Sequence, residues 1–202
     1  VHGKWYGDAC GAAFALEIIG ERWSLLIVRE LMLGPRRFSE LRASLPGLSA
    51  KVLTERLEGL EGAGVLTRRK LPPPASVQVY ELTAWGYLAE TAILELGRWA
   101  ARSQFHDPSL PLSPVSLMLS LRTMIDRDAA LGVMATIRFE VGVDHFLVRL
   151  NDGELAIARS AEGDPAPDFV VRTPVAFPFL RVIYGKEALV GVMAEGDLAV
   201  TG

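Results

Sequence analysis

The sequence predicts an α+β protein made of two domains. Three observations carry the prediction: apolar residues recur at helical spacing before residue 64, strand-like segments follow there and again in the second half, and closely spaced prolines separate the halves. The segment from His106 to Pro111 reads as a linker because its prolines interrupt both helix and sheet. We therefore expect domains at 1–105 and 113–202, joined by a linker at 106–112.

The composition excludes several classes of protein. The chain has 202 residues, of which 50% are hydrophobic and 22% charged, so it can build cores and lacks the bias of disordered, collagen-like or coiled-coil chains. Its apolar stretch at 108–121 contains prolines and is shorter than the roughly 18 to 20 residues that a membrane span needs. One cysteine, Cys10, precludes an intramolecular disulfide and suits a reducing cytoplasm. We expect a cytoplasmic protein with no membrane partner.

Charge is unevenly distributed along the chain. The net charge is −3, but residues 1–110 carry +1 and residues 111–202 carry −4. Residues 34–70 contain eight lysines and arginines and four glutamates, which gives this segment a net charge of +4. This asymmetry suggests that the two domains have different tasks, and that the first can meet an anionic partner.

In the first half, glycine and proline punctuate a series of helices and one hairpin. Ser49 is a suitable N-cap, and the helix after it carries one apolar stripe and one polar face. Strand-like segments flank a proline-rich tip, and Thr83 caps a long helix with many apolar residues, which a partner chain would cover. The expected helices are 12–20, 23–33, 38–45, 49–62 and 83–102, and the expected strands are 65–70 and 77–82.

This order is that of a winged helix-turn-helix, and the residues carry a closer likeness. From Cys10 to about Gly86 the chain resembles the HxlR-type family of bacterial transcriptional regulators, most clearly in Gly20-Glu21-Arg22-Trp23, Gly34-Pro35-Arg36-Arg37-Phe38 and Ser49-Ala50-Lys51-Val52-Leu53-Thr54-Glu55-Arg56-Leu57. The resemblance implies a homodimer, formed through the N-terminal segment and helix 83–102, on a pseudopalindromic double-stranded operator. It places recognition helices in adjacent major grooves and wings on the flanking backbone or minor groove. Gly11, where the family often has proline, and the triple-proline wing tip depart from the pattern.

The candidate DNA contacts follow from where such a helix meets the groove. The first turns of a recognition helix read base edges, and nearby cations or hydroxyls contact phosphates. Ala50 allows close approach, Lys51 can reach guanine or phosphate, and Thr54 can contact thymine. The expected DNA-binding residues are Arg36, Arg37, Ser39, Ser49, Ala50, Lys51, Thr54, Arg56, Arg69 and Lys70.

Two of the candidate residues have competing interpretations. Arg56 lies beside the apolar stripe, so it can contact a phosphate or form a structural ion pair with a glutamate. Cys10 occupies the position at which some members of the resembled family sense oxidants or electrophiles. Asp8 and Glu17 would raise its pKa if they lay close, so a buried, inert thiol is the other interpretation, and the one that we favour.

The second half predicts a smaller α+β domain with an antiparallel sheet. Expected helices are 113–130, 173–184 and 188–194, and expected strands are 135–141, 145–150, 154–160, 168–172 and 198–201. Residues 168–174 and 194–202 resemble parts of the sterol carrier protein type 2-like fold, which implies an apolar cavity. Candidate lining residues are Phe139, Phe146, Phe169, Phe177, Phe179, Leu180 and Tyr184, although aromatic residues at such spacing more often belong to a plain core.

These expectations favour a regulator over an enzyme. The three histidines are far apart and lack metal-ligand spacing, and no glycine-rich phosphate loop is present, so we expect no catalytic residues, metal or cofactor. We predict a dimeric DNA-binding transcriptional regulator whose second domain responds to a small hydrophobic ligand. The alternative is a carrier or scavenger of hydrophobic molecules, in which the first domain serves mainly for dimerisation.

Overall fold

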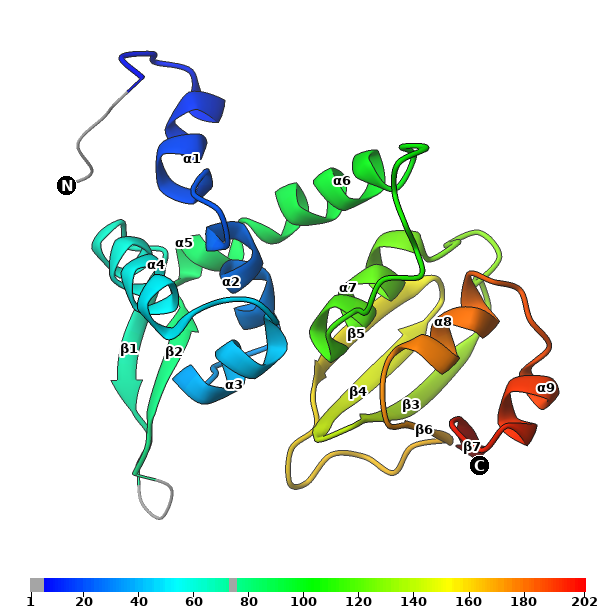
Figure 1. Cartoon of the computed structure of the whole chain (residues 1–202). Coiled ribbons are helices and arrows are strands. Elements are labelled where there is room, and N and C mark those ends of the chain that lie inside the picture. Colours follow the sequence, from blue (N-terminus) through cyan, green and yellow to red (C-terminus); the bar gives the residue numbers. More distant parts are fainter. Residues whose placement is uncertain (1–5, 73–75) are drawn as a thin grey trace. The chain divides into compact units, whose positions relative to one another are not determined.

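The computed structural model describes residues 6–72 and 76–202 (Figure 1). It divides into two compact units, Val1–Ile93 and Leu94–Gly202. The domain boundaries expected around 106–112 stay a prediction. The architecture is mixed α+β with two separate sheets, one in each unit.

The first unit consists of helices around a small core, followed by a hairpin. Its elements are α1 (Gly11–Ile19), α2 (Ser24–Leu31), α3 (Phe38–Ser44), α4 (Ala50–Gly62), β1 (Leu66–Lys70), β2 (Gln78–Leu82) and α5 (Ala84–Tyr87), while α6 (Glu90–Ala100) crosses the boundary between the units. The buried apolar side chains of α2, α3 and α4 form the core, among them Ile27, Leu31, Leu41, Leu53, Leu57 and Leu60. The expected stripe on α4 therefore packs inward.

Short-range signals define the ends of these helices. The Ser49 hydroxyl accepts a hydrogen bond from the backbone N–H of Val52 at 3.2 Å, and the Thr83 hydroxyl accepts one from Gly86 at 3.0 Å. Gly47 turns the chain between α3 and α4 with φ of 88°, which is the left-handed region that glycine tolerates. Both caps lie where the sequence predicts them.

The hairpin β1–β2 is antiparallel, with Leu66 opposite Leu82 and Lys70 opposite Gln78. Arg36, in the loop between α2 and α3, forms an isolated antiparallel bridge with Tyr80 by exchanging two backbone hydrogen bonds, at 2.9 and 2.8 Å. This bridge ties the hairpin to the helical core. The hairpin tip at 73–75 lies outside the described residues.

The single helix expected at 83–102 is wrong. It is divided into α5 and α6 because the N–H groups of Leu88 and Ala89 bond to carbonyls three residues back rather than four, as in a tighter 3₁₀ turn. Gly86, a weak helix former, lies in this turn and packs against the backbone of Val65.

The second unit places helices over one face of a five-stranded sheet. Its elements are α7 (Pro114–Met124), β3 (Met134–Val141), β4 (Asp144–Asn151), β5 (Glu154–Arg159), β6 (Phe169–Thr173), α8 (Phe177–Ile183), α9 (Leu189–Ala194) and β7 (Ala199–Thr201). The strand order is β5-β4-β3-β6-β7, and α7 and α8 lie over the same face (Figure 1). The core between them includes Leu117 and Met118 of α7 and Phe146 and Val148 of β4.

The sheet is not wholly antiparallel, because β6 runs parallel to β3. The segment after β5 crosses to the far side of β3. There the Asp168 N–H donates to the Thr136 carbonyl, and the Asp168 carboxylate accepts from the Thr136 N–H, both at 2.7 Å. These bonds start β6 in the direction of β3. Alternation along a strand identifies its faces but not its neighbour or direction, so the sequence could not show this.

Two expected helices of the second unit have different limits. The helix expected at 113–130 ends at Met124, since Ile125 is extended and the Asp126 carboxylate then accepts a bond from Ala129 in a turn. The helix expected from residue 173 begins only at Phe177, because Thr173 belongs to β6 and its hydroxyl donates to the Val175 carbonyl.

Candidate DNA-binding surface

The first turns of α4 present an exposed polar surface. The Lys51 side chain is 86% exposed, and its Nζ lies 4.0 Å from Glu55, a distance that holds it only loosely. Thr54 is exposed and donates to the Ala50 carbonyl at 3.0 Å, while Ser49 is engaged as the cap. A capped helix end with an exposed cation suits contact with an anionic groove.

The predicted contacts at the start of α3 divide into two kinds. Arg37 and Ser39 are exposed. Arg36 is only 7% exposed, and its guanidinium donates to the Ser44 hydroxyl at 3.1 Å and lies 3.8 Å from Glu40. Its surroundings favour a structural role over a phosphate contact.

The wing cations are mostly engaged with carboxylates of the same unit. Arg68 pairs with Glu61 at 2.7 Å, and this hydrogen bond is the main reason that the pKa of Glu61 is lowered. Arg69 pairs with Glu81 across the hairpin. Lys70 is exposed at the end of β1, and it is the wing cation that we retain for a DNA contact.

Arg56 points away from the helix start toward the turn between α1 and α2. Its Nη2 lies 3.0 Å from the Glu21 carboxylate and its Nε donates to the Arg22 carbonyl at 3.2 Å. Of its two interpretations, these contacts favour the ion pair. The sequence did not identify Glu21 and Arg22 as the partners of Arg56, because these contacts span 35 and 34 residues and leave no local signal.

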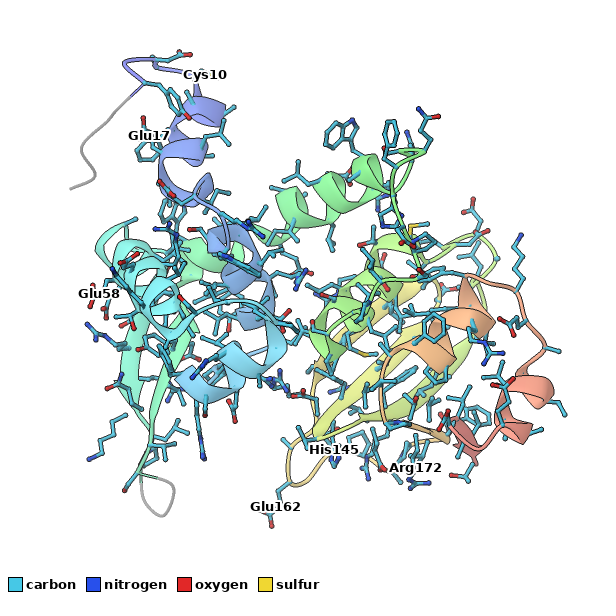
Figure 2. The ribbon with its side chains drawn as sticks, in the orientation of Figure 1. Cys10, Glu17, Glu58, His145, Glu162 and Arg172 are labelled. Atoms are coloured by element: carbon cyan, nitrogen blue, oxygen red, sulfur yellow. The ribbon has the colours of Figure 1, made fainter. Side chains whose placement is uncertain are left out.

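Cys10 lies at the start of α1 and is exposed, so the expectation of a buried thiol is wrong (Figure 2). The nearby backbone N–H groups of Ala12 and Ala13 lower the pKa of its thiol. The Asp8 carboxylate binds the backbone N–H of Cys10 at 2.9 Å instead of raising that pKa. An exposed thiol at a helix N-terminus has the setting of a reactive cysteine.

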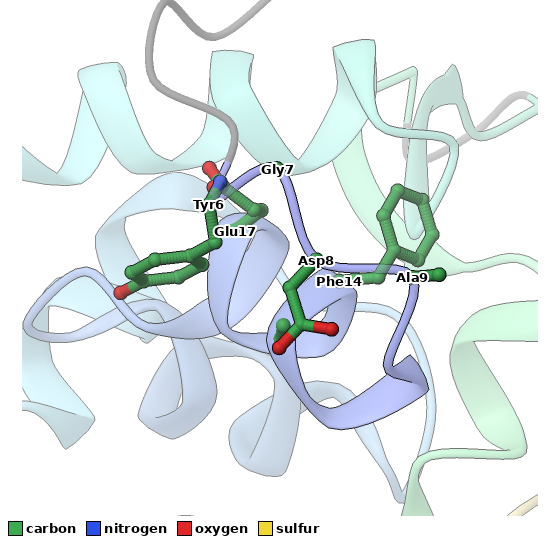
Figure 3. A pocket seen from close by; sticks show the side chains of 7 residues that line it. Tyr6, Gly7, Asp8, Ala9, Phe14 and Glu17 are labelled. Carbon is green, nitrogen blue, oxygen red and sulfur yellow. The ribbon is translucent and has the colours of Figure 1, made fainter.

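Two hollows lie beside α1. The smaller, about 280 Å³, is formed where the segment before α1 folds back on the helix, with the Tyr6 N–H bonded to the Glu17 carboxylate (Figure 3). The larger, about 700 Å³, lies between α1 and α4 and is lined in part by Leu16, Glu21, Arg56 and Leu60. Such volumes are large enough for a small molecule or for side chains of another chain.

Large apolar side chains are exposed on α1 and along α5 and α6. Phe14 and Leu16 of α1 are 43% and 55% exposed, and Trp99 of α6 is 74% exposed. Trp85, Leu88 and Leu96 add to the exposed set. Large exposed apolar side chains on one helix often contact another protein surface.

The aromatic residues predicted to line a cavity in the second unit are only partly brought together. Phe139 and Phe179 meet edge to face, with centroids 5.2 Å apart. Phe146 is fully buried beneath the Arg159 guanidinium, whereas Phe169 and Phe177 are 47% and 45% exposed. Tyr184 bonds Ser120 at 3.0 Å, and burial raises the pKa of its phenol. A cavity lined by these residues therefore stays a prediction.

Within residues 6–72 and 76–202, no cluster of three or more histidine, cysteine or acidic side chains could hold a metal ion. In the same ranges, no helix is long and apolar enough to cross a membrane.

Comparison with known proteins relates residues 18–107 to a family of regulators. Residues 18–107 match the family model described as HxlR-like helix-turn-helix. The transcriptional regulator YvaP of Bacillus subtilis is 41% identical over 95 residues, which cover 47% of this chain and 86% of YvaP. The B. subtilis regulator YodB is 37% identical over 94 residues, covering 46% and 82%. The solved structure of reduced YodB is 35% identical, covers 50% of this chain and 98% of that one, and gives a TM-score of 0.43. The chain thus belongs to the HxlR-like helix-turn-helix family of transcriptional regulators.

Proposed function

We propose that this chain binds a pseudopalindromic double-stranded DNA operator as a homodimer, with α4 of each copy in a major groove. The observation that carries the proposal is the exposed, capped start of α4 in a unit of this family. Lys51 and Thr54 would read bases, while Arg37, Ser39 and Lys70 would contact phosphates and set the register. Ser49 and Ala50 would let the backbone approach the groove.

Selection from randomised duplex DNA tests this proposal. We expect enrichment of two half-sites about one helical turn apart, bound less tightly as salt rises. Lys51→Ala and Thr54→Ala should each weaken specific binding by about 1 to 3 kcal/mol and leave the circular dichroism spectrum unchanged. Lys186→Ala, which removes an exposed cation in the second unit, is the matched control and should not change affinity. Equal effects of all three substitutions would contradict the assignment.

The exposed apolar faces of α1 and α6 support the homodimer. A polar substitution in such a face should separate the copies, since a charge there cannot be buried without a partner. We expect Trp99→Glu to shift the sedimentation coefficient to that of a monomer and to abolish operator binding. A wild-type chain that sediments as a monomer at micromolar concentration would overturn this part of the proposal.

The second unit would hold a small hydrophobic effector, as its resemblance to sterol carrier protein type 2-like domains implies. The contact of Phe139 with Phe179 and the half-exposed Phe169, Phe177 and Tyr184 support an apolar site that ligand binding would complete. Titration with a fluorescent fatty acid tests it: saturable binding that Phe179→Ala weakens is the expected result. Binding without any change in DNA affinity would favour the carrier function.

The setting of Cys10 supports a second input, the sensing of oxidants or electrophiles. Its thiol is exposed and its pKa is lowered by backbone N–H groups at the start of α1. The rate of alkylation by iodoacetamide against pH should therefore show a midpoint below the ordinary value of about 8.5, and the midpoint should rise in urea. Identical midpoints in the two conditions would mean that the fold does not activate the thiol.

A further inference from the structure

The Arg56 side chain joins α4 to the turn before α2 through two hydrogen bonds. Arg56, at the middle of α4, donates from Nη2 to the Glu21 carboxylate at 3.0 Å and from Nε to the Arg22 carbonyl at 3.2 Å. Its side chain is 24% exposed, against 86% for Lys51 five residues earlier. The guanidinium is thus committed to protein groups on two of its edges.

The turn that accepts the Arg56 hydrogen bonds is followed by a residue in the left-handed backbone region. Trp23, at the start of α2, has φ of 82°, a left-handed conformation that costs a bulky residue energy and persists only where its surroundings impose it. The Arg22 guanidinium lies 5.2 Å from the Trp23 ring centroid. The ring also reaches Gly47, where an added Cβ would lie 3.9 Å from the Trp23 Cη2. The turns before α2 and before α4 therefore meet at Trp23.

We infer that Arg56 and Glu21 form a positioning pair that sets the rotation of α4, and that Arg56 does not serve as a phosphate contact. This rests on the proposed binding of DNA by α4. The apolar stripe of Leu53, Leu57 and Leu60 holds the helix in place, but hydrophobic contact is not directional and tolerates small rotations. Hydrogen bonds from Arg56 are directional, and base contacts by Lys51 and Thr54 fail with displacements of less than an ångström.

Glu21→Gln separates the two roles by the sign of its effect. If Arg56 were a phosphate contact restrained by Glu21, removing that carboxylate would free a cation and strengthen DNA binding. If the pair positions α4, the same substitution weakens binding to the selected operator, by about tenfold, and brings it closer to binding of random duplex. Glu58→Gln is the matched control, because it also removes one exposed carboxylate, from α4 itself (Figure 2). It should leave binding unchanged or slightly tighter.

Arg56→Ala and the double variant complete the test. We expect Arg56→Ala to weaken operator binding as Glu21→Gln does, and the double variant to be no weaker than the worse single variant. The slope of log affinity against log salt should stay that of the wild type, whereas loss of a phosphate contact would reduce it by about 0.9. Where Arg56→Ala fails to fold, Arg56→Lys retains the charge but cannot make both bonds, and should still lose discrimination.

The outcomes distinguish this inference from the proposal beneath it. A wild-type chain that shows no salt-dependent binding to any selected duplex would overturn the proposed function itself. Operator binding by the wild type, together with tighter binding by Glu21→Gln or a smaller salt slope for Arg56→Ala, would overturn only the positioning pair.

Discussion

Replacing Gly86 by alanine should strongly destabilise the first unit, because no space exists for even one added carbon. A Cβ at Gly86 would lie 2.1 Å from the Val65 carbonyl oxygen and 3.2 Å from the Leu82 Cβ. The Val65 carbonyl also accepts hydrogen bonds from the Thr83 backbone and side chain, at 3.0 and 3.2 Å. Overpacking costs about 1 to 3 kcal/mol and a disturbed cap about 1 kcal/mol more, so we expect a loss of about 2 to 4 kcal/mol.

Urea unfolding followed by tryptophan fluorescence measures this loss, because all four tryptophans precede residue 100 and report on the first half. Gly62→Ala is the matched control: a Cβ there meets nothing within 4 Å, and the residue is helical. That substitution should raise the free energy of unfolding by about 0.4 to 1 kcal/mol. A Gly86→Ala variant within about 0.5 kcal/mol of the wild type would refute the packing argument.

Two further predictions concern the second unit. Hydrogen bonds from Arg181 lower the pKa values of Glu187 and Glu195, so their contribution to stability is present above the ordinary carboxyl range and is lost as pH falls through the lowered values. The melting temperature of the wild type should thus fall more steeply below pH 5 than that of the double Glu→Gln variant. Asp144→Asn should cost about 3 kcal/mol in far-ultraviolet circular dichroism melts, because Asp144 is 9% exposed and holds Arg159 at 2.6 Å.

Each of these has a control. Equal pH slopes for the wild type and the double variant would show that Arg181 does not couple the two glutamates to folding. Glu154→Gln is the control for Asp144→Asn. It breaks the ion pair of Glu154 with Arg127, whose side chains are 73% and 63% exposed, and should cost less than about 1 kcal/mol. If Glu154→Gln and Asp144→Asn were equally costly, burial would not be what makes the Asp144 pair matter.

Local signals explain why the first unit is readable from sequence. Ser49 and Thr83 cap helices where expected, Gly47 permits the turn before α4, and apolar spacing identifies the buried stripe through Leu53 and Leu57. These features act over three or four residues, so a short stretch of sequence is enough to identify each of them. The same spacing predicted which face of α4 carries the exposed Lys51.

The structure decided what depends on distant residues. Arg36 and Arg37 are adjacent and alike in sequence, yet only Arg36 is buried, because its backbone pairs with Tyr80. The direction of β6 follows from the anchoring of Asp168 on Thr136, 32 residues earlier.

By itself, the sequence determined the order of elements up to Thr83, the family and the exposed face of the recognition helix. Only the tertiary structure decided that Arg56 meets Glu21 and Arg22, that Cys10 is exposed, and that the helix after Thr83 breaks at Leu88 and Ala89. The physical reason is that caps and periodicity act within one turn of helix, whereas burial and ion pairing depend on which remote segments pack together.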